Sequence, residues 1–151
     1  MKQLLVVYSS QSGASAQLAR AAAAAALEEA VVEVIVRRAA DASVQDLQSA
    51  AGVLLVAAEN SGSLAGGMKD FLDRVFYPAI GHALVLPYAL LVSAGNDGRG
   101  AVTQAQRILS GVPFTEAAEP LILRGDIGPP HLAQASDLGR ALATGLEMGI
   151  F

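Results

Sequence analysis

Short apolar runs alternate along the chain with longer segments of mixed polarity. The apolar runs are continuous and rich in branched side chains, which is the pattern of strands that are buried on both faces of a sheet. Polar residues or glycines stand at the ends of these runs, and such residues favour turns. We therefore predict strands at Leu4–Tyr8, Val31–Val36, Gly52–Ala58, Tyr88–Ser93 and Pro120–Leu123.

Helices are predicted in the intervening segments. The segment Ser15–Ala30 is rich in alanine and contains no glycine or proline, and alanine is the strongest helix former. In Leu64–Tyr77 the apolar residues recur three or four apart, and Pro78 is expected to end that helix. The predicted helices are Ser15–Ala30, Asp41–Ala50, Leu64–Tyr77, Ala101–Ser110 and Leu132–Glu147.

This alternation of strands and helices predicts a doubly wound α/β fold. Right-handed crossovers between parallel strands place helices on both faces of one sheet, and 151 residues suit one domain of this kind. We therefore expect a single domain over residues 1–151 with a five-stranded parallel sheet. Ligands of such sheets bind at the carboxyl ends of the strands, so the loops there form the candidate site.

Composition and charge exclude several kinds of function. The formal net charge is −4 and no basic block occurs, so a nucleic-acid partner is not expected. Cysteine is absent, which excludes disulfides, thiolate catalysis and iron–sulfur clusters. The two histidines, His82 and His131, stand in no familiar metal-ligand or triad spacing, so we expect no metal site. The apolar stretches Leu4–Val7 and Ala83–Val92 are too short for a signal peptide or a membrane span, which predicts a cytoplasmic protein without membrane partners.

The loop after the first predicted strand is a candidate anion site. Its sequence SSQSGAS brings hydroxyls and a glycine to the start of a helix, where free N–H groups and the helix dipole attract a phosphate. The loop has no lysine or arginine and the chain has no P-loop motif, so a single terminal phosphate fits better than a nucleoside triphosphate. A plain turn capped by a serine is the alternative. The candidate residues are Ser10, Gln11, Ser12, Gly13, Ala14 and Ser15.

Two further polar loops follow the third and fourth predicted strands. Their small residues let a flat ligand approach the backbone. Glu59 is a candidate acceptor for a ring N–H, with a surface acid as the alternative, and Arg99 is either a partner for a substrate phosphate or a solvated side chain. The candidate residues are Glu59, Asn60, Ser61, Gly62 and Ser63 in one loop, and Ala94, Gly95, Asn96, Asp97 and Gly100 in the other. The pairs Lys69–Asp73 and Asp70–Arg74 are read as a solvated helix face without a catalytic role.

The motifs in these loops resemble those of flavodoxin-like proteins. Tyr8–Ser15 resembles the flavodoxin phosphate loop T-x-T-G-x-T, with Ser10, Ser12 and Ser15 in the places of its three hydroxyl residues. Ala58–Lys69 resembles the P-E-Y-F-G-S-x-x-G-x-x-K segment of flavodoxin-like NAD(P)H and quinone reductases. The ending Gly145–Phe151 is similar to that of short flavodoxins, so the resemblance runs from end to end.

The resemblance implies the strand order 2-1-3-4-5 and bound FMN. It assigns the FMN phosphate to Ser10–Ser15 and the isoalloxazine ring to the space between Glu59–Ser63 and Ala94–Gly100. The sequence departs from the family at Asn60 and Ser61, where aromatic residues often stack on the ring. An aromatic from Tyr77, from Phe151 or from another subunit is the remaining candidate for covering the ring, and ordinary packing is the alternative for each.

Two functions of different classes are compatible with this resemblance. One is an FMN-dependent oxidoreductase in which NAD(P)H reduces the flavin and a quinone or similar small acceptor oxidises it, with no catalytic side chain required. The other is a one-electron carrier that docks redox proteins, and a third possibility is a scaffold that has lost its flavin. The low charge and the missing aromatics favour the enzyme. The apolar ending Met148, Ile150 and Phe151 suggests a homo-oligomer, unless these residues only dock the last helix.

Overall fold

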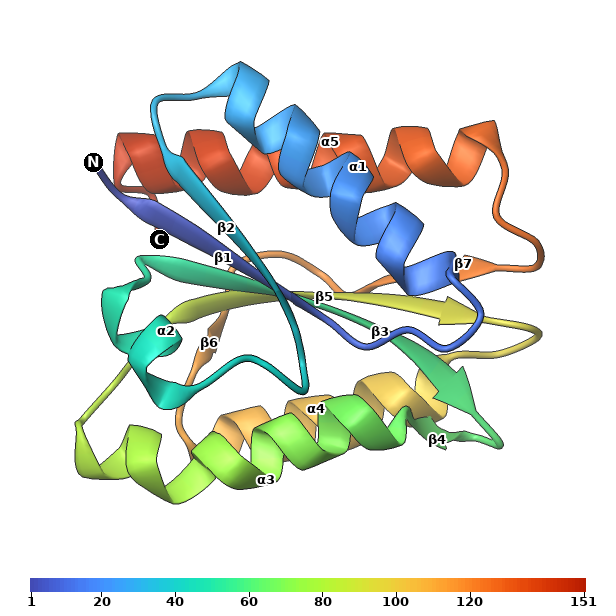
Figure 1. Cartoon of the computed structure of the whole chain (residues 1–151), viewed down its shortest axis with the longest axis horizontal. Coiled ribbons are helices and arrows are strands. Elements are labelled where there is room, and N and C mark those ends of the chain that lie inside the picture. Colours follow the sequence, from blue (N-terminus) through green and yellow to red (C-terminus); the bar gives the residue numbers. More distant parts are fainter.

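The computed structural model describes all residues, 1–151, as three layers with a sheet between two layers of helices (Figure 1). The strands are β1 (Gln3–Tyr8), β2 (Glu33–Arg38), β3 (Gly52–Asn60), β4 (Ser63–Leu64), β5 (Pro87–Ala94), β6 (Thr115–Glu116) and β7 (Leu121–Arg124). The helices are α1 (Ala14–Glu29), α2 (Val44–Ser49), α3 (Gly66–Gly81), α4 (Arg99–Gly111) and α5 (Pro129–Met148). All ten predicted elements are present, and the doubly wound α/β prediction is confirmed.

The sheet has the order β2-β1-β3-β5, and its far edge is shared by β6 and β7, which both pair with β5 in parallel. With β4 and β6 left aside, the order β2-β1-β3-β5-β7 corresponds to the expected 2-1-3-4-5, but β6 and β7 divide the edge position between them. The split falls at Ala117–Pro120, between the two short strands. Pro120 lacks the N–H that a continuous ladder would need. The sequence analysis missed β6 and also β4, which pairs antiparallel with β3.

Two boundary predictions were wrong. Pro78 lies inside α3, which continues to Gly81, because Ala79 is fully buried against the core and tertiary packing outweighs the local propensity. The second strand begins at Glu33 and not at Val31. Val31 is 70% exposed and belongs to the turn that reverses the chain after α1.

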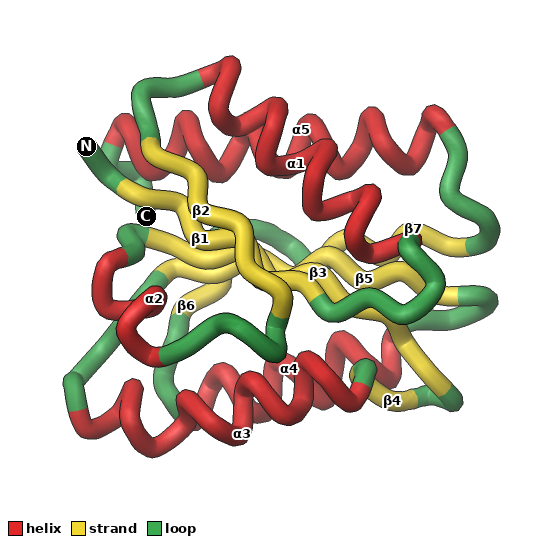
Figure 2. Tube along the Cα trace, viewed as in Figure 1, coloured by secondary structure: helices red, strands yellow, loops and turns green.

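The two faces of the sheet are packed differently. The face under α3 and α4 is filled by large side chains, among them Phe71 and Met68. On the face under α1 and α5, the buried residues that α1 contributes are mostly alanines, so these two helices approach closely, and a Cβ at Gly139 would overlap the backbone of Ala22. Figure 2 shows the helices on both sides of the sheet. None of the helices is both long enough and apolar enough to span a bilayer.

The carboxyl ends of β1, β3, β5 and β7 meet at one edge of the sheet, at the right in Figure 1. The amino ends of α1 and α4 begin at this same edge, on opposite faces of the sheet. The fold therefore brings the three candidate loops together, as expected for parallel sheets.

Candidate functional site

The loop between β1 and α1 leaves an uncapped helix start. Gly13 is the N-cap residue, with φ +99°, and no side chain caps the helix. Its own N–H donates to Ser10 Oγ at 3.1 Å, and the first intrahelical donor is Gln17, at 3.0 Å from the oxygen of Gly13. The N–H groups of the first three helical residues, 14–16, precede this donor and have no intrahelical acceptor. They are available to an anion.

A small pocket of about 100 Å³ lies inside this loop, and we call it the loop pocket. It is lined by Ser9, Ser10, Gln11, Ser12, Ser15, Ala58, Asn60 and Ala65. No lysine or arginine lines it, so its attraction for an anion comes from N–H groups and hydroxyls.

Ser15 has a structural partner in addition to its place in the loop pocket. Its side chain is 1% exposed, and its Oγ lies 3.2 Å from Oγ of Ser93 at the end of β5. This hydrogen bond ties the start of α1 to the sheet. Because two hydroxyls share one hydrogen bond here, one of the two O–H groups remains free to donate toward a ligand.

A larger pocket of about 420 Å³ lies next to the loop pocket, and we call it the strand-end pocket. It is lined by Ser12, Ala14, Ala58, Glu59, Asn60, Ser93, Ala94, Gly95, Gly125, Asp126 and Ile127. The last three residues belong to a fourth loop, between β7 and α5, that the sequence analysis did not name. A signal was present in the sequence, because Gly125 lies two residues after the predicted strand Pro120–Leu123; in the structure its φ is +80°.

His131 holds this fourth loop in place. Its Nδ1 accepts the N–H of Gly128 at 3.1 Å, and its Nε2 lies 2.8 Å from the carbonyl oxygen of Arg124. Because Nδ1 accepts a hydrogen bond, the tautomer that fits both contacts has Nε2–H donating to the carbonyl oxygen of Arg124. The side chain thus connects both ends of the loop that carries Gly125–Ile127.

The carboxylate of Glu59 caps α4. Its Oε1 accepts the N–H of Gly98 at 2.9 Å, and its Oε2 accepts the N–H of Ala101 at 3.2 Å. The sequence analysis expected either an acceptor for a ligand ring or a surface acid, and neither expectation included this role. The hydrogen bonds fix the β3–β4 turn against the start of α4.

The β3–β4 turn is a tight hairpin in which Asn60 pairs with Ser63. Both central residues have positive φ, 51° at Ser61 and 78° at Gly62, as in a type I′ turn. The turn touches α4 so closely that a Cβ at Gly100 would overlap the carbonyl oxygen of Gly62. Asn60 and Ser61 therefore hold turn positions, where the family resemblance led us to look for stacking side chains.

The predicted site residues fall into distinct groups. Ser10, Gln11, Ser12, Ser15 and Asn60 line the loop pocket, and Ser12, Ala14, Glu59, Asn60, Ala94 and Gly95 line the strand-end pocket, so Ser12 and Asn60 border both. Gly62, Ser63, Asp97 and Gly100 line a separate groove at the start of α4, together with Arg99, Thr103, Gln104 and Arg107, which we call the α4 groove. Gly13, Ser61 and Asn96 line none of these spaces.

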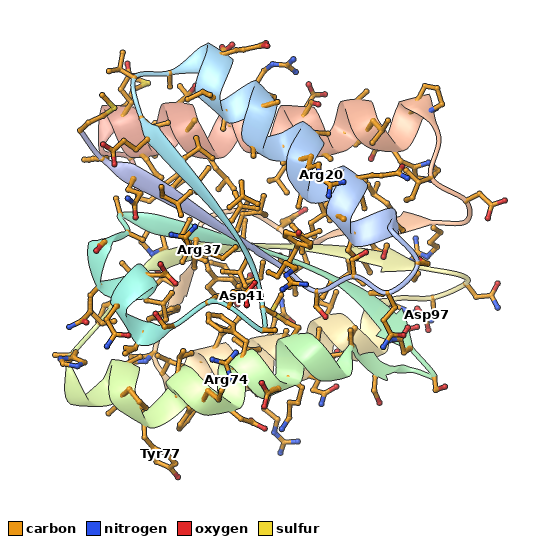
Figure 3. The ribbon with its side chains drawn as sticks, in the orientation of Figure 1. Arg20, Arg37, Asp41, Arg74, Tyr77 and Asp97 are labelled. Carbon is orange, nitrogen blue, oxygen red and sulfur yellow. The ribbon has the colours of Figure 1, made fainter.

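No aromatic side chain lines the loop pocket or the strand-end pocket. Tyr77 points into solvent from α3, and Figure 3 shows it on the other side of the molecule from Asp97. Phe151 packs on Gly145 at the end of the chain, which lies at the far end of the sheet. Neither aromatic covers the site within this chain. No group of three or more His, Asp or Glu side chains is arranged to hold a metal ion.

The helix pairs Lys69–Asp73 and Asp70–Arg74 form as expected, at 2.8 and 2.9 Å. Arg74 has a further role, because its guanidinium also donates to the carbonyl oxygens of Ala39 and Ala42 at 2.6 and 2.9 Å. These bonds join α3 to the segment before α2. They lie on the helix face and are outside the three pockets of the site.

Comparisons with known proteins connect the fold to flavodoxins. No protein-family model matches the sequence, and a sequence search of the curated proteins gives no match. Among solved structures, a flavodoxin from the domain Archaea is 19% identical, with a TM-score of 0.84, covering 95% of this chain and 98% of that one. The two-electron reduced flavodoxin of Megasphaera elsdenii is 20% identical, with a TM-score of 0.78 and coverages of 93% and 98%.

A larger redox protein also contains this architecture. Rubredoxin oxygen:oxidoreductase from Desulfovibrio gigas is 14% identical, with a TM-score of 0.84, and the match covers 99% of this chain but only 37% of that one. Together these likenesses show that the chain has a flavodoxin-like fold.

Proposed function

We propose that this protein binds FMN and acts as an oxidoreductase that passes electrons from NAD(P)H to a quinone or a similar small acceptor. The observation that carries the proposal is the uncapped start of α1, which opens into a hydroxyl-lined pocket beside a larger strand-end pocket. A ligand with one terminal phosphate and a flat ring system fits this pair of pockets. The flavodoxin-like fold supports the same ligand.

The phosphate end of the site fits FMN by its donors. The free N–H groups at 14–16 and the hydroxyls of Ser10 and Ser12 supply hydrogen bonds to a dianion without a cation. A Cβ added to Gly13 meets no atom within 4 Å, so the loop is not crowded at this residue. The phosphate is thus held mainly by the backbone.

The ring end of the site is open. Gly95 and Gly125 line the strand-end pocket from two loops, and a Cβ on either would meet no atom within 4 Å. Bound flavin supplies the redox chemistry at this place. The residues of the chain hold and orient it, and the lack of an aromatic cover leaves room for nicotinamide or quinone to lie flat against the ring.

A one-electron carrier is the second candidate. It is supported by the solved neighbours that are described as flavodoxins and that this chain covers almost completely, at 98% of their length. Its weakness is the lack of a ring-bracketing side chain and the small net charge of −4, which gives little electrostatic steering toward a protein partner. The two candidates share the flavin and differ in what reduces it.

The first experiment identifies the cofactor. The bound compound is extracted from purified protein and identified by mass, and the stripped protein is titrated with FMN. We expect FMN to bind at micromolar concentration or below. Recovery of FAD, or no binding of added FMN, would contradict the proposal, and the second result would favour a scaffold without flavin.

The second experiment separates the enzyme from the carrier. The FMN form is mixed anaerobically with NADPH or NADH and then with a quinone, while the flavin absorbance is recorded. Bleaching by a nucleotide and recovery with the quinone support the oxidoreductase. No reduction by either nucleotide, together with reduction by a chemical titrant in two separate one-electron steps, supports the carrier.

We also propose that the protein forms a homo-oligomer. Met148 and Ile150 are 67% and 65% exposed at the end of the chain, and Phe151 is only partly covered by Gly145. Exposed apolar side chains that are neighbours in sequence favour an interface with another copy. Sedimentation velocity over a hundredfold range of concentration tests this, and a monomer throughout would exclude it.

A further inference from the structure

The α4 groove is a polar space of about 680 Å³ that the proposed flavin site does not use. No hydrophobic residue lines it, so it is unsuited to an adenine, nicotinamide or quinone ring. Its side chains include two guanidinium groups and a single carboxylate, within a chain whose net charge is −4. The groove is thus a local positive region suited to a charged, oxygen-rich group.

Three donors follow one stripe of α4. Arg99, Thr103 and Arg107 are spaced at i, i+4 and i+8, which places neighbours about 6 Å apart along the helix axis. Arg99 is paired with Asp97, with Nε 2.6 Å from Oδ1. Arg107 is exposed and forms no ion pair in the protein. Arg107 is therefore a free guanidinium beside a hydroxyl, and this combination recognises phosphate.

A rigid wall separates this stripe from the strand-end pocket. The wall consists of the β3–β4 turn and the start of α4, joined by the carboxylate of Glu59 and by the contact of Gly100 with Gly62. Gln104 strengthens the junction, because its Oε1 accepts the N–H of Leu64 at 2.8 Å. Gly95 lines the strand-end pocket and Asp97 lines the α4 groove, so the loop between β5 and α4 borders both spaces.

We propose that Arg99, Thr103 and Arg107 bind the 2′-phosphate of NADPH and make NADPH the preferred reductant over NADH. The inference rests on the proposed function, in which nicotinamide lies in the strand-end pocket. The adenosine end of the dinucleotide then extends past the wall, and its 2′-phosphate enters the groove. A phosphomonoester dianion matches a stripe of two arginines and one hydroxyl, and it is the only group that distinguishes NADPH from NADH.

The test uses 2′,5′-ADP, which carries the phosphate of interest but no nicotinamide. Its dissociation constant for the FMN-saturated protein is measured by calorimetry, with 5′-AMP as the comparison. We expect tighter binding of 2′,5′-ADP than of 5′-AMP. We expect Arg107→Gln to weaken 2′,5′-ADP binding by about tenfold or more, which is the effect of losing a charge-assisted hydrogen bond. The control Arg140→Gln removes a partly exposed arginine on α5, far from the groove residues in the chain, and leaves binding unchanged.

The same variants separate this inference from the proposed function. With reduction of FMN followed directly, Arg107→Gln is expected to raise the dissociation constant of NADPH while that of NADH stays within about twofold. If FMN binds and NADPH reduces it equally well in Arg107→Gln and parent, the inference fails and the proposed function stands. If FMN does not bind, but 2′,5′-ADP still binds in an Arg107-dependent way, the phosphate site stands and the proposed function fails. No binding of 2′,5′-ADP to the parent overturns the inference directly.

Discussion

The N-cap residues of α1 and α4 have almost the same backbone conformation, but only the start of α4 is bound by a carboxylate of the protein. Both begin at a glycine N-cap in the left-handed region, with φ and ψ of 99° and −12° at Gly13 and of 93° and −18° at Gly98. At α4 the N–H groups of Gly98 and Ala101, which have no acceptor within the helix, donate to the carboxylate of Glu59. At α1 the N–H groups of the first helical turn have no such partner.

This difference assigns a role to each helix start. Where a carboxylate of the protein already accepts hydrogen bonds from the N–H groups at a helix start, that start has little attraction left for an anion. Where these N–H groups lack an acceptor, the helix start attracts an anion from solution. The protein therefore has one backbone-based anion site, at α1, while any anion near α4 must be bound by side chains. The predictions below act on these two helix starts and on the loops and side chains beside them.

The largest effect is expected from Ser12→Asp at the α1 loop. Ser12 is exposed and lines both the loop pocket and the strand-end pocket, so the added carboxylate lies where the phosphate dianion binds. We expect FMN affinity to fall by about a hundredfold or more, from like-charge repulsion. Stability is expected to be unchanged or slightly higher, because an acid near a helix start is favourable.

Fluorescence titration with FMN and urea unfolding measure the two quantities separately. Gln48→Glu adds the same charge at an exposed position near the end of α2 and controls for net charge. Equal FMN affinity in Ser12→Asp and parent would remove the α1 loop from the site.

The next effect is expected from Glu59→Ala at the start of α4. Removal of the carboxylate leaves the N–H groups of Gly98 and Ala101 without their ionised acceptor. We expect the free energy of unfolding to fall by about 2 kcal/mol, the loss of a helix cap bonded through a charge. Glu59→Gln keeps one acceptor oxygen and should show a smaller loss.

Added sulfate provides a second readout for Glu59→Ala. Because the variant makes the start of α4 resemble that of α1, sulfate is expected to stabilise the variant more than the parent. Glu119→Ala removes an exposed glutamate without a hydrogen-bonded side chain and is the control. Unfolding curves that coincide for Glu59→Ala and parent would show that the carboxylate does not matter at α4.

The contrast between the helix starts also explains what could be predicted from the sequence. Both loops have glycines and polar residues after an apolar run, and this local pattern predicted them as loops at strand ends, where the structure has them. The cap on α4 comes from Glu59, which is 39 residues away from Gly98 along the chain. A contact of that range depends on the register of neighbouring strands, which local pattern does not contain.

The same limit applies to the other missed features. Ser93 was predicted as a strand end but not as a site residue, because its partner Ser15 comes from a different loop at 78 residues of separation. The fourth loop was missed because Gly125 and Asp126 match no motif of the family resemblance. By contrast, the central strands β1, β3 and β5 were predicted well, since each is a continuous apolar run whose burial on both faces leaves a strong local signal.

A smaller effect is expected from His131→Ala. The substitution removes the bridge between Gly128 and Arg124 and frees the loop that forms one wall of the strand-end pocket. We expect FMN affinity to fall by about fivefold, since part of the binding energy is then needed to order the loop. Amide exchange of residues 124–128 should become faster in the FMN-free variant.

The control for this variant is His82→Ala, at an exposed position after α3. It removes the other imidazole and is expected to change neither FMN affinity nor amide exchange in residues 124–128. If His131→Ala behaves in the same way, the loop is held by its backbone alone.

The smallest effect is expected from Asp97→Asn at the α4 groove, and it tests whether side chains make this end of the site attract an anion. The side chain of Arg99 donates to the Asp97 carboxylate at 2.6 and 3.3 Å, and these hydrogen bonds hold the pKa of Asp97 below its ordinary value. A lowered pKa means that the carboxylate stays ionised through the neutral range and is protonated only in stronger acid, so a substitution is needed to remove its charge.

Asp97→Asn should release Arg99 for the nucleotide and tighten 2′,5′-ADP binding by about threefold. The gain is modest because the pair is exposed and screened. Raising the salt concentration should reduce this gain, and Asp137→Asn, which breaks the similar pair with Arg140 on α5, should give none. Weaker or unchanged 2′,5′-ADP binding in Asp97→Asn would mean that Arg99 does not reach the phosphate and that Arg107 acts without it.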